Sequence, residues 1–193
     1  MSKDVEVIIL SRQNMSYKDS ERCYLWDIKF DYIGDEKSSF KTHRKLNAAI
    51  GDYIVVKNDE TELLENDRII PLFVGLVDSN DSKTDDATID AKTIYSIADV
   101  DFIATKKAGS SVQIHLFSLI NRYLLSDPTK MTDGIKVRID EASAYYSYQP
   151  NDQPKVENLT EYFIHMFEKT GVVWEVEWFG KDDNGKLVIS TVI

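Results

Sequence analysis

Cysteine is nearly missing from this chain of 193 residues, since Cys23 is its only one. An intrachain disulfide is therefore excluded, which fits a protein made in a reducing cytoplasm. The chain also lacks an apolar run of about eighteen residues, the length that a membrane-spanning helix requires, so we expect no membrane span. Its first ten residues, MSKDVEVIIL, lack the arrangement of a signal peptide, because acidic residues interrupt a short apolar run.

Basic residues are in the minority. The chain has 23 Lys and Arg against 33 Asp and Glu, which gives a net charge of −10, and both halves of the chain are acidic. Binding to nucleic acid through phosphate contacts requires a clustered positive face, so the composition disfavours a nucleic-acid partner. The content of 42% hydrophobic and 29% charged residues is that of an ordinary soluble globular protein.

The motifs of common active sites are missing as well. Only eight glycines occur, and neither a Walker loop nor a GxGxxG turn is present. The histidines His43, His115 and His165 lie in separate segments, without the spacing of a zinc site. Cys23 has no histidine near it in the sequence and is expected to pack as a small apolar residue. We therefore predict no catalytic residue, metal or cofactor, and a protein that is not an enzyme, although triads can also assemble from distant residues.

One acidic segment, residues 78–86, opens like an EF-hand calcium loop, with Asp78 and Asn80 at its first and third positions. Lys83 stands where that loop needs glycine, and Ile89 stands where it needs the bidentate glutamate, which excludes an EF-hand. We expect a solvated hairpin loop here, and a looser cation site is left open. Other neighbouring carboxylates, at 99 and 101 and at 175 and 177, are not expected to form an acid/base pair.

Polar and apolar residues alternate with period two through the first hundred residues, as in half-buried strands. The clearest run is residues 24–33, which places five large residues on one face that we expect to pack on a core: Tyr24, Trp26, Ile28, Phe30 and Tyr32. Further strands are predicted at residues 5–10, 40–44, 53–57, 69–77 and 87–92, with an acidic connector at 58–67. Short strands at this spacing are typical of a small antiparallel barrel or sandwich.

The period changes after residue 108, where helices are predicted. Ser110 or Ser111 can cap a first helix, which ends before Asp127-Pro128. Asn158 and Glu161 resemble a capping box for a second helix, which Gly171 ends. Its expected buried stripe is Leu159, Tyr162, Phe163, Met166 and Phe167.

Strands return around and after the second helix. One is predicted at residues 135–139, and residues 172–178 and 187–193 are predicted to form a hairpin with a turn at Asn184-Gly185. Trp174, Val176 and Trp178 share one face of that hairpin. We therefore predict an α+β, β-rich protein: an antiparallel β-barrel or sandwich domain at 1–107, and a smaller α+β domain at 108–193 with two helices and a C-terminal hairpin. The last strand either closes a sheet or belongs to a longer protein.

Tyrosines gather in a proline-flanked segment, where Tyr145, Tyr146 and Tyr148 precede Pro150. Exposed tyrosines mark binding surfaces and can stack on sugars or on partner proteins. These three are our candidate partner-binding residues, and they would make the chain a carbohydrate- or protein-binding module. The alternative is a loop packed onto the second domain.

The segment 68–105 is the most informative one. A buried strand ends in Phe73-Val74-Gly75-Leu76-Val77, a returning strand covers residues 87–92 with Ala91, and a short helical turn follows at 94–98. We expect residues 73–77 to pair with residues 88–92. Together with Gly51-Asp52 and the aliphatic residues that follow it, this order resembles the N-terminal region of tail-tip hub proteins of long-tailed phages, the tail-associated lysin or baseplate-hub family. The resemblance covers residues 1–105 and extends weakly into the first helix.

That resemblance implies a structural role in the tail tip or baseplate of a phage or prophage. The chain would assemble with itself as a ring at the end of the tail tube and contact other tail and baseplate proteins. It would be found in the virion tail after assembly in the host cytoplasm. Hub proteins of this kind usually run longer, and no lytic motif occurs here, so peptidoglycan cleavage is not implied. Ring size, host and receptor stay open.

Overall fold

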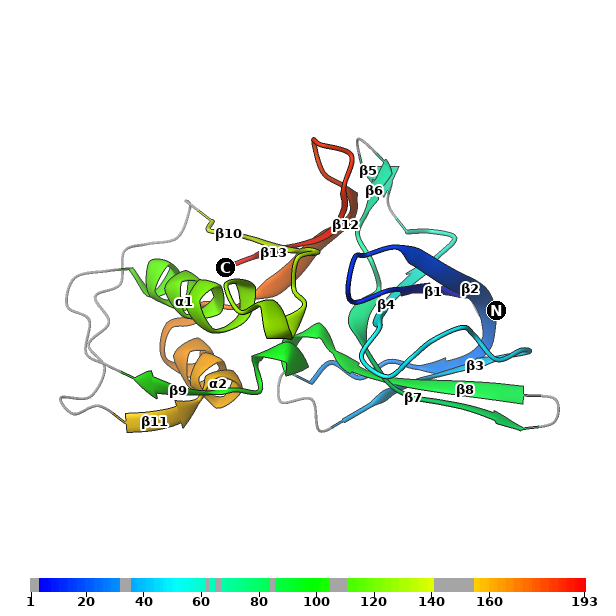
Figure 1. Cartoon of the computed structure of the whole chain (residues 1–193), viewed down its shortest axis with the longest axis horizontal. Coiled ribbons are helices and arrows are strands. Elements are labelled where there is room, and N and C mark those ends of the chain that lie inside the picture. Colours follow the sequence, from blue (N-terminus) through cyan, green and yellow to red (C-terminus); the bar gives the residue numbers. More distant parts are fainter. Residues whose placement is uncertain are drawn as a thin grey trace.

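A computed structural model describes residues 4–31, 36–61, 63–64, 67–83, 86–104, 111–140 and 155–193. A closed barrel occupies one side of the molecule, and two helices with a second sheet occupy the other (Figure 1). The fold class expected from the sequence, a β-rich α+β protein with a barrel, two helices and a C-terminal hairpin, is confirmed.

Six antiparallel strands close the barrel in the order β1-β2-β3-β8-β7-β4. β4 returns to β1, so that Val7 pairs with Val56 and the sheet has no open edge. The strands are β1 (Val5–Leu10), β2 (Tyr17–Asp27), β3 (Ser38–Thr42), β4 (Tyr53–Asn58), β7 (Phe73–Lys83) and β8 (Asp86–Thr93).

The expected core face of residues 24–33 is wrong. β2 begins earlier and ends at Asp27, and its buried residue is Cys23. Tyr24 and Trp26 are 40% and 39% exposed, and Phe30 is 78% exposed. The reason is a shift in the β2–β3 register between Cys23 and Leu25, which ends the regular alternation. Ile28 packs partly against the barrel interior, and Tyr32 lies outside the described residues.

The predicted loop at 78–86 is also wrong, because most of it is strand. β7 runs to Lys83 and β8 begins at Asp86, so the two strands reach the right-hand end of the molecule in Figure 1. The predicted return pairing is confirmed for Leu76 and Val77, which face Lys92 and Ala91, whereas Thr88 lies further out, opposite Asp81. The backbone groups of the acidic residues are thus used in a strand ladder.

The second sheet has the order β10-β13-β12-β6-β5. β10 runs parallel to β13, and β12 forms the predicted hairpin with β13. The connector expected at 58–67 contributes the edge strand β5, and Ile69 of β6 pairs with Phe179 of β12. The strands are β5 (Leu63–Leu64), β6 (Arg68–Ile69), β10 (Ile135–Arg138), β12 (Glu175–Lys181) and β13 (Leu187–Val192).

The expected face of the C-terminal hairpin is correct at Trp174, which is 2% exposed. Beyond it, a register shift between Val176 and Trp178 changes the side on which residues point. Phe179 consequently takes the core position, and the guanidinium of Arg68 lies 4.1 Å from the ring centre of Trp178.

Both predicted helices are confirmed. Ser111 caps the first by accepting a hydrogen bond from the backbone N–H of Ile114, and Asn158 caps the second. Gly171 ends the second helix with a φ of 73°, but Phe167 of the expected buried stripe is 52% exposed, at the last turn.

The helical elements are η2 (Ile94–Ala98), α1 (Val112–Ile120), its π-helical continuation η3 (Asn121–Leu125), η4 (Pro128–Lys130) and α2 (Leu159–Thr170). A two-stranded sheet of β9 (Asp101–Ala104) and β11 (Lys155–Asn158) lies beside α2.

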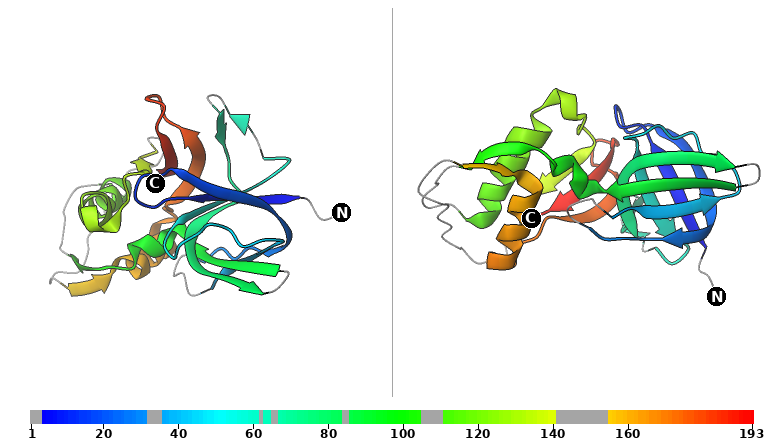
Figure 2. Two further views of the ribbon diagram at one scale, coloured as in Figure 1. Left: turned by 45° about the vertical axis from the view of Figure 1, so that its right-hand side comes forward. Right: turned by 90° about the horizontal axis from the view of Figure 1, so that it is seen from below.

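Two hydrophobic cores share the barrel wall. Ile54 and Val56 of β4 point into the barrel, with Val7, Phe40 and Ile89. Figure 2 shows the barrel and the helices side by side. The alternate residues of β4, Tyr53 and Val55, belong to a second core between them. This core also contains Leu116, Leu159, Met166 and Trp174. The division into domains at 1–107 and 108–193 stays a prediction.

Gly75 is required where β7 lies against the end of β8, opposite Thr93. A Cβ atom at this position would overlap the carbonyl oxygen of Lys92 and the ring of Phe73. Because a backbone oxygen in a strand ladder cannot move aside, we expect Gly75→Ala to lower the free energy of unfolding by about 3 kcal/mol in urea denaturation. The control is Gly185→Ala, which meets no atom and carries only the cost of a φ of 75°, about 1 kcal/mol. Equal losses in the two variants would contradict this close contact.

Candidate functional surface

A polar cluster holds the barrel to the helical side of the molecule. The carboxylate of Asp52, which is nearly buried, accepts hydrogen bonds from Lys18 Nζ at 2.5 Å and from the backbone N–H of Ala49 at 2.8 Å. Beside it, Arg12 Nη2 donates to the carbonyl oxygen of Lys130 at 2.9 Å. Three segments that are far apart in the sequence are thereby joined.

Tyr53 adds a second polar link at the same place. Its hydroxyl donates to the carbonyl oxygen of Met131 at 3.1 Å. Burial raises the pKa of Tyr53 to about 12, so the hydroxyl keeps its proton at neutral pH and acts as a donor. Nearby, the side chain of Met15 packs directly on Gly134, where a Cβ would overlap it. These contacts join the barrel to the segment around residues 130–134.

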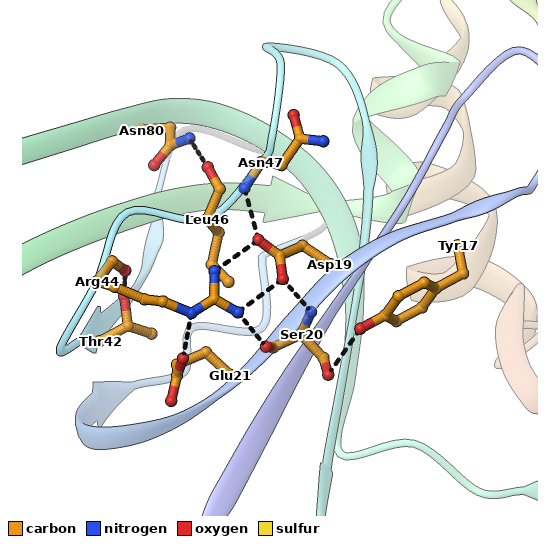
Figure 3. Close-up of polar contacts among 9 residues, drawn as sticks. All are labelled: Tyr17, Asp19, Ser20, Glu21, Thr42, Arg44, Leu46, Asn47 and Asn80. Carbon is orange, nitrogen blue, oxygen red and sulfur yellow. Dashed lines mark hydrogen bonds and ion pairs between the residues drawn. The ribbon is translucent and has the colours of Figure 1, made fainter.

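A second cluster fastens the loop after β3 to the outer face of β2 (Figure 3). Arg44 donates through Nη1 and Nη2 to the two carboxylate oxygens of Asp19 at 2.8 and 2.7 Å, and its Nε lies 2.6 Å from Glu21 Oε2. The backbone N–H of Asn47 donates to Asp19 at 2.9 Å. Asn80 completes the attachment by donating to the carbonyl oxygen of Leu46.

Electrostatics in this second cluster favour the ion pair. The hydrogen bond from Arg44 is the main reason why the pKa of Asp19 lies well below its usual value, and the backbone N–H groups of Asn47 and Ser20 act in the same direction. The same contact raises the pKa of Arg44. Neither group is therefore suited to exchange protons near neutral pH.

Exposed apolar residues lie at the end of β2 beyond this cluster. Tyr24, Leu25 and Trp26 are 40%, 54% and 39% exposed, and we call this stretch the β2 apolar face. Leu25 and Trp26 pair with Lys41 and Phe40 of β3, so their side chains leave the strand on different sides. The ring of Tyr24 stacks on His43 with centroids 4.7 Å apart. A hydrogen bond with Asp86 raises the pKa of Tyr24. Tyr24 is thus held in place by its neighbours, while all three residues keep part of their surface open to solvent.

The residues considered for nucleophilic or metal chemistry do not come together. Cys23 is buried, and burial raises its pKa to about 12, so it carries no thiolate at neutral pH. His115 shares a hydrogen bond of 2.9 Å with Tyr162, and His165 is exposed on α2. In the part of the chain that the structure describes, no group of three or more His, Cys, Asp or Glu residues could hold a metal ion.

The carboxylates named from the sequence are engaged in structure or open to water. Asp99 accepts a hydrogen bond from the side chain of Asn158 at 2.8 Å. Glu177 accepts from Arg138, and this bond lowers the pKa of Glu177. Glu175 is exposed at the start of β12.

The candidate residues Tyr145, Tyr146 and Tyr148 lie outside the described residues, so their role stays a prediction. Sequence reasoning missed the partners of Asp52 and Asp19, because Lys18 and Arg44 are 34 and 25 positions away. Gly51-Asp52 enters the sequence analysis only through the resemblance to tail proteins, and it does not indicate these partners. Among the described helices, none is long and apolar enough to cross a membrane.

No family model matches this sequence, and a comparison with curated proteins finds no match. Solved structures do resemble it. A tail protein from Neisseria meningitidis has a TM-score of 0.56 at 14% identity, over 96% of this chain and 50% of that one. A prophage tail protein from Listeria monocytogenes has a TM-score of 0.47 at 14% identity, over 97% and 50%. An E. coli component of the type VI secretion system has a TM-score of 0.40 at 10% identity, over 98% and 45%.

The chain therefore spans about half the length of the tail proteins that it matches. At 14% identity the likeness to the Neisseria protein concerns the fold alone. The fold expected from the resemblance to phage tail proteins is thus confirmed.

The ion pair of Asp19 with Arg44 should make the stability of the protein depend on pH. Because folding lowers the pKa of Asp19 from its ordinary 3.8, its stabilisation is complete above that pH and is lost as the pH falls further. At neutral pH we expect the melting temperature of Asp19→Asn to lie a few degrees below that of the wild type. This difference in melting temperature should shrink between about pH 4 and about pH 2. Thermal unfolding followed by circular dichroism measures this. The exposed Asp101→Asn serves as the control, and a gap for Asp19→Asn that stays constant down to the lowest pH would refute the assignment.

Proposed function

We propose that this chain is a structural component of a phage or prophage tail, placed at the tail tip or baseplate. The observation that carries the proposal is the fold shared with a tail protein along 96% of the chain. Fold alone does not determine function, but the described side chains favour the same answer. The carboxylates and the cysteine that could do chemistry are paired, buried or isolated, as expected of a scaffold rather than an enzyme.

We further propose that copies of the chain assemble as a ring at the end of the tail tube. A ring requires two different patches that meet between neighbouring copies. The β2 apolar face is a suitable patch, because Tyr24 and Leu25 expose apolar surface and Arg44 fixes the loop beside it. Other tail and baseplate proteins would be the remaining partners, in a virion tail assembled in the host cytoplasm. The domains 1–107 and 108–193 would then be the barrel and helical parts of each subunit.

The ring proposal predicts self-association through β2. Size-exclusion chromatography with light scattering should show an oligomer of defined mass for the wild type. Leu25→Asp, which places a charge on the β2 apolar face, should shift the population to monomer with unchanged circular dichroism. The control is Ile50→Asp, at another exposed apolar residue (78% exposed), which should leave the mass unchanged.

Two outcomes would contradict these proposals separately. A wild type that stays monomeric at the highest soluble concentration argues against the ring. The tail role is tested by the genes beside this one, which should encode tail-tube and tape-measure proteins, and metabolic neighbours would exclude it.

A further inference from the structure

An open cavity of about 330 Å³ lies where the barrel meets the second sheet. The start of β7 and η2 line it with Phe73 and Tyr95. Phe30, which follows β2, and Glu175 and Val176 of β12 also line it. The volume falls within the range of pockets that bind small molecules or single side chains. We call it the acidic cavity.

The charge of the acidic cavity has one sign. Asp31 and Glu175 line it, and none of its lining residues is Lys, Arg or His. Asp31 is held in place, because its carbonyl oxygen accepts a hydrogen bond from Thr93 Oγ1 and its Oδ2 accepts one from the backbone N–H of Glu36 at 3.0 Å. Glu175 is exposed at the first position of β12. Two carboxylates that line one cavity favour a cationic occupant.

Aromatic rings complete the walls of the acidic cavity. Phe30 is 78% exposed and lies 6.5 Å from Phe73 between ring centres. Tyr95 is fixed, because its hydroxyl accepts a hydrogen bond from the backbone N–H of Val176 at 3.2 Å and its ring meets Trp174 edge-on at 5.6 Å. Ring faces attract cations, most strongly where carboxylates add to the field. The preferred cation is a guanidinium, which is planar, can stack on rings and can form paired bonds to carboxylates.

A second cavity adjoins the first and has the opposite character. It measures about 350 Å³. Apart from Glu175, its lining residues are apolar and come from α1, α2 and the segment between α2 and β12: Leu116, Phe163, Ile164, Phe167, Val172, Val173 and Trp174. Phe167, wrongly expected to be buried, forms its exposed rim. We call it the apolar cavity. Because Glu175 lines both cavities, one bound segment can reach both.

We propose that these two cavities together bind a peptide segment of a partner protein, which places an arginine in the acidic cavity and a large apolar side chain in the apolar one. The carboxylates and rings select the guanidinium, and the apolar walls select a leucine-like side chain. The net charge of −10 adds long-range attraction for a basic segment. This inference goes beyond the tail role and does not depend on it.

The test uses three small probes and two-dimensional NMR of the labelled full chain. N-acetyl-arginine amide should shift the amide signals of Tyr95, Glu175 and Val176, and N-acetyl-leucine amide those of Phe163 and Phe167. N-acetyl-citrulline amide has the shape of arginine without its charge and should bind about tenfold more weakly than the arginine probe. A dipeptide amide with both side chains should bind more tightly than either single probe.

Variants then assign the contacts. Glu175→Gln should weaken binding of the arginine probe about fivefold, whereas Glu161→Gln, an exposed carboxyl change on α2, should leave it unchanged. Phe167→Ala should weaken the leucine probe only. The proposal is overturned if arginine and citrulline probes bind equally, if the shifts spread over the acidic surface, if Glu175→Gln binds like the wild type, or if neither amino-acid probe binds. Because monomeric protein suffices, a failure of ring assembly would not affect the result.

Discussion

Burial of strand β4 on both faces is the constraint on which the rest of the structure depends. Tyr53, Ile54, Val55 and Val56 are all 0% exposed, and they alternate between the barrel interior and the core beneath the helices. Burying each such side chain is worth about 1.5–3 kcal/mol. The barrel wall would therefore expose a large apolar area without the helices, and the helices would lack a surface to pack on without the barrel. Each part of the molecule completes the other.

The interactions that stabilise this arrangement also engage several of its charged groups. Asp52 and Asp19 are bound by Lys18 and Arg44, and Glu177 is bound by Arg138. Exposed apolar and aromatic side chains remain at the end of β2 and around the two adjoining cavities. Exposed apolar surface is suited to contacts with other chains, and both proposals use it.

The sequence was informative where the pattern was local. The helices begin at the caps Ser111 and Asn158, and the second ends at Gly171, as expected. Such caps can be predicted because they act within a few residues of the chain. The predicted inward and outward faces of β2 and β12 were wrong beyond their register shifts. A bulge depends on the partner strand, so the sequence of the bulged strand does not indicate it. The pairing of Ile69 with Phe179 links residues 110 positions apart, beyond the reach of any pattern. The two cavities combine such distant segments, so neither was expected.

The place of β6 in the second sheet has a consequence for synthesis on the ribosome. All six barrel strands lie within residues 5–93, so the barrel can close while the remaining chain is still being made. β5 and β6 are made at the same time, but β6 has to wait for β12 and β13 before its sheet exists. Contacts of such long range slow folding. β5 and β6 are therefore strands that a nascent-chain chaperone can still bind while the rest of the chain is being made.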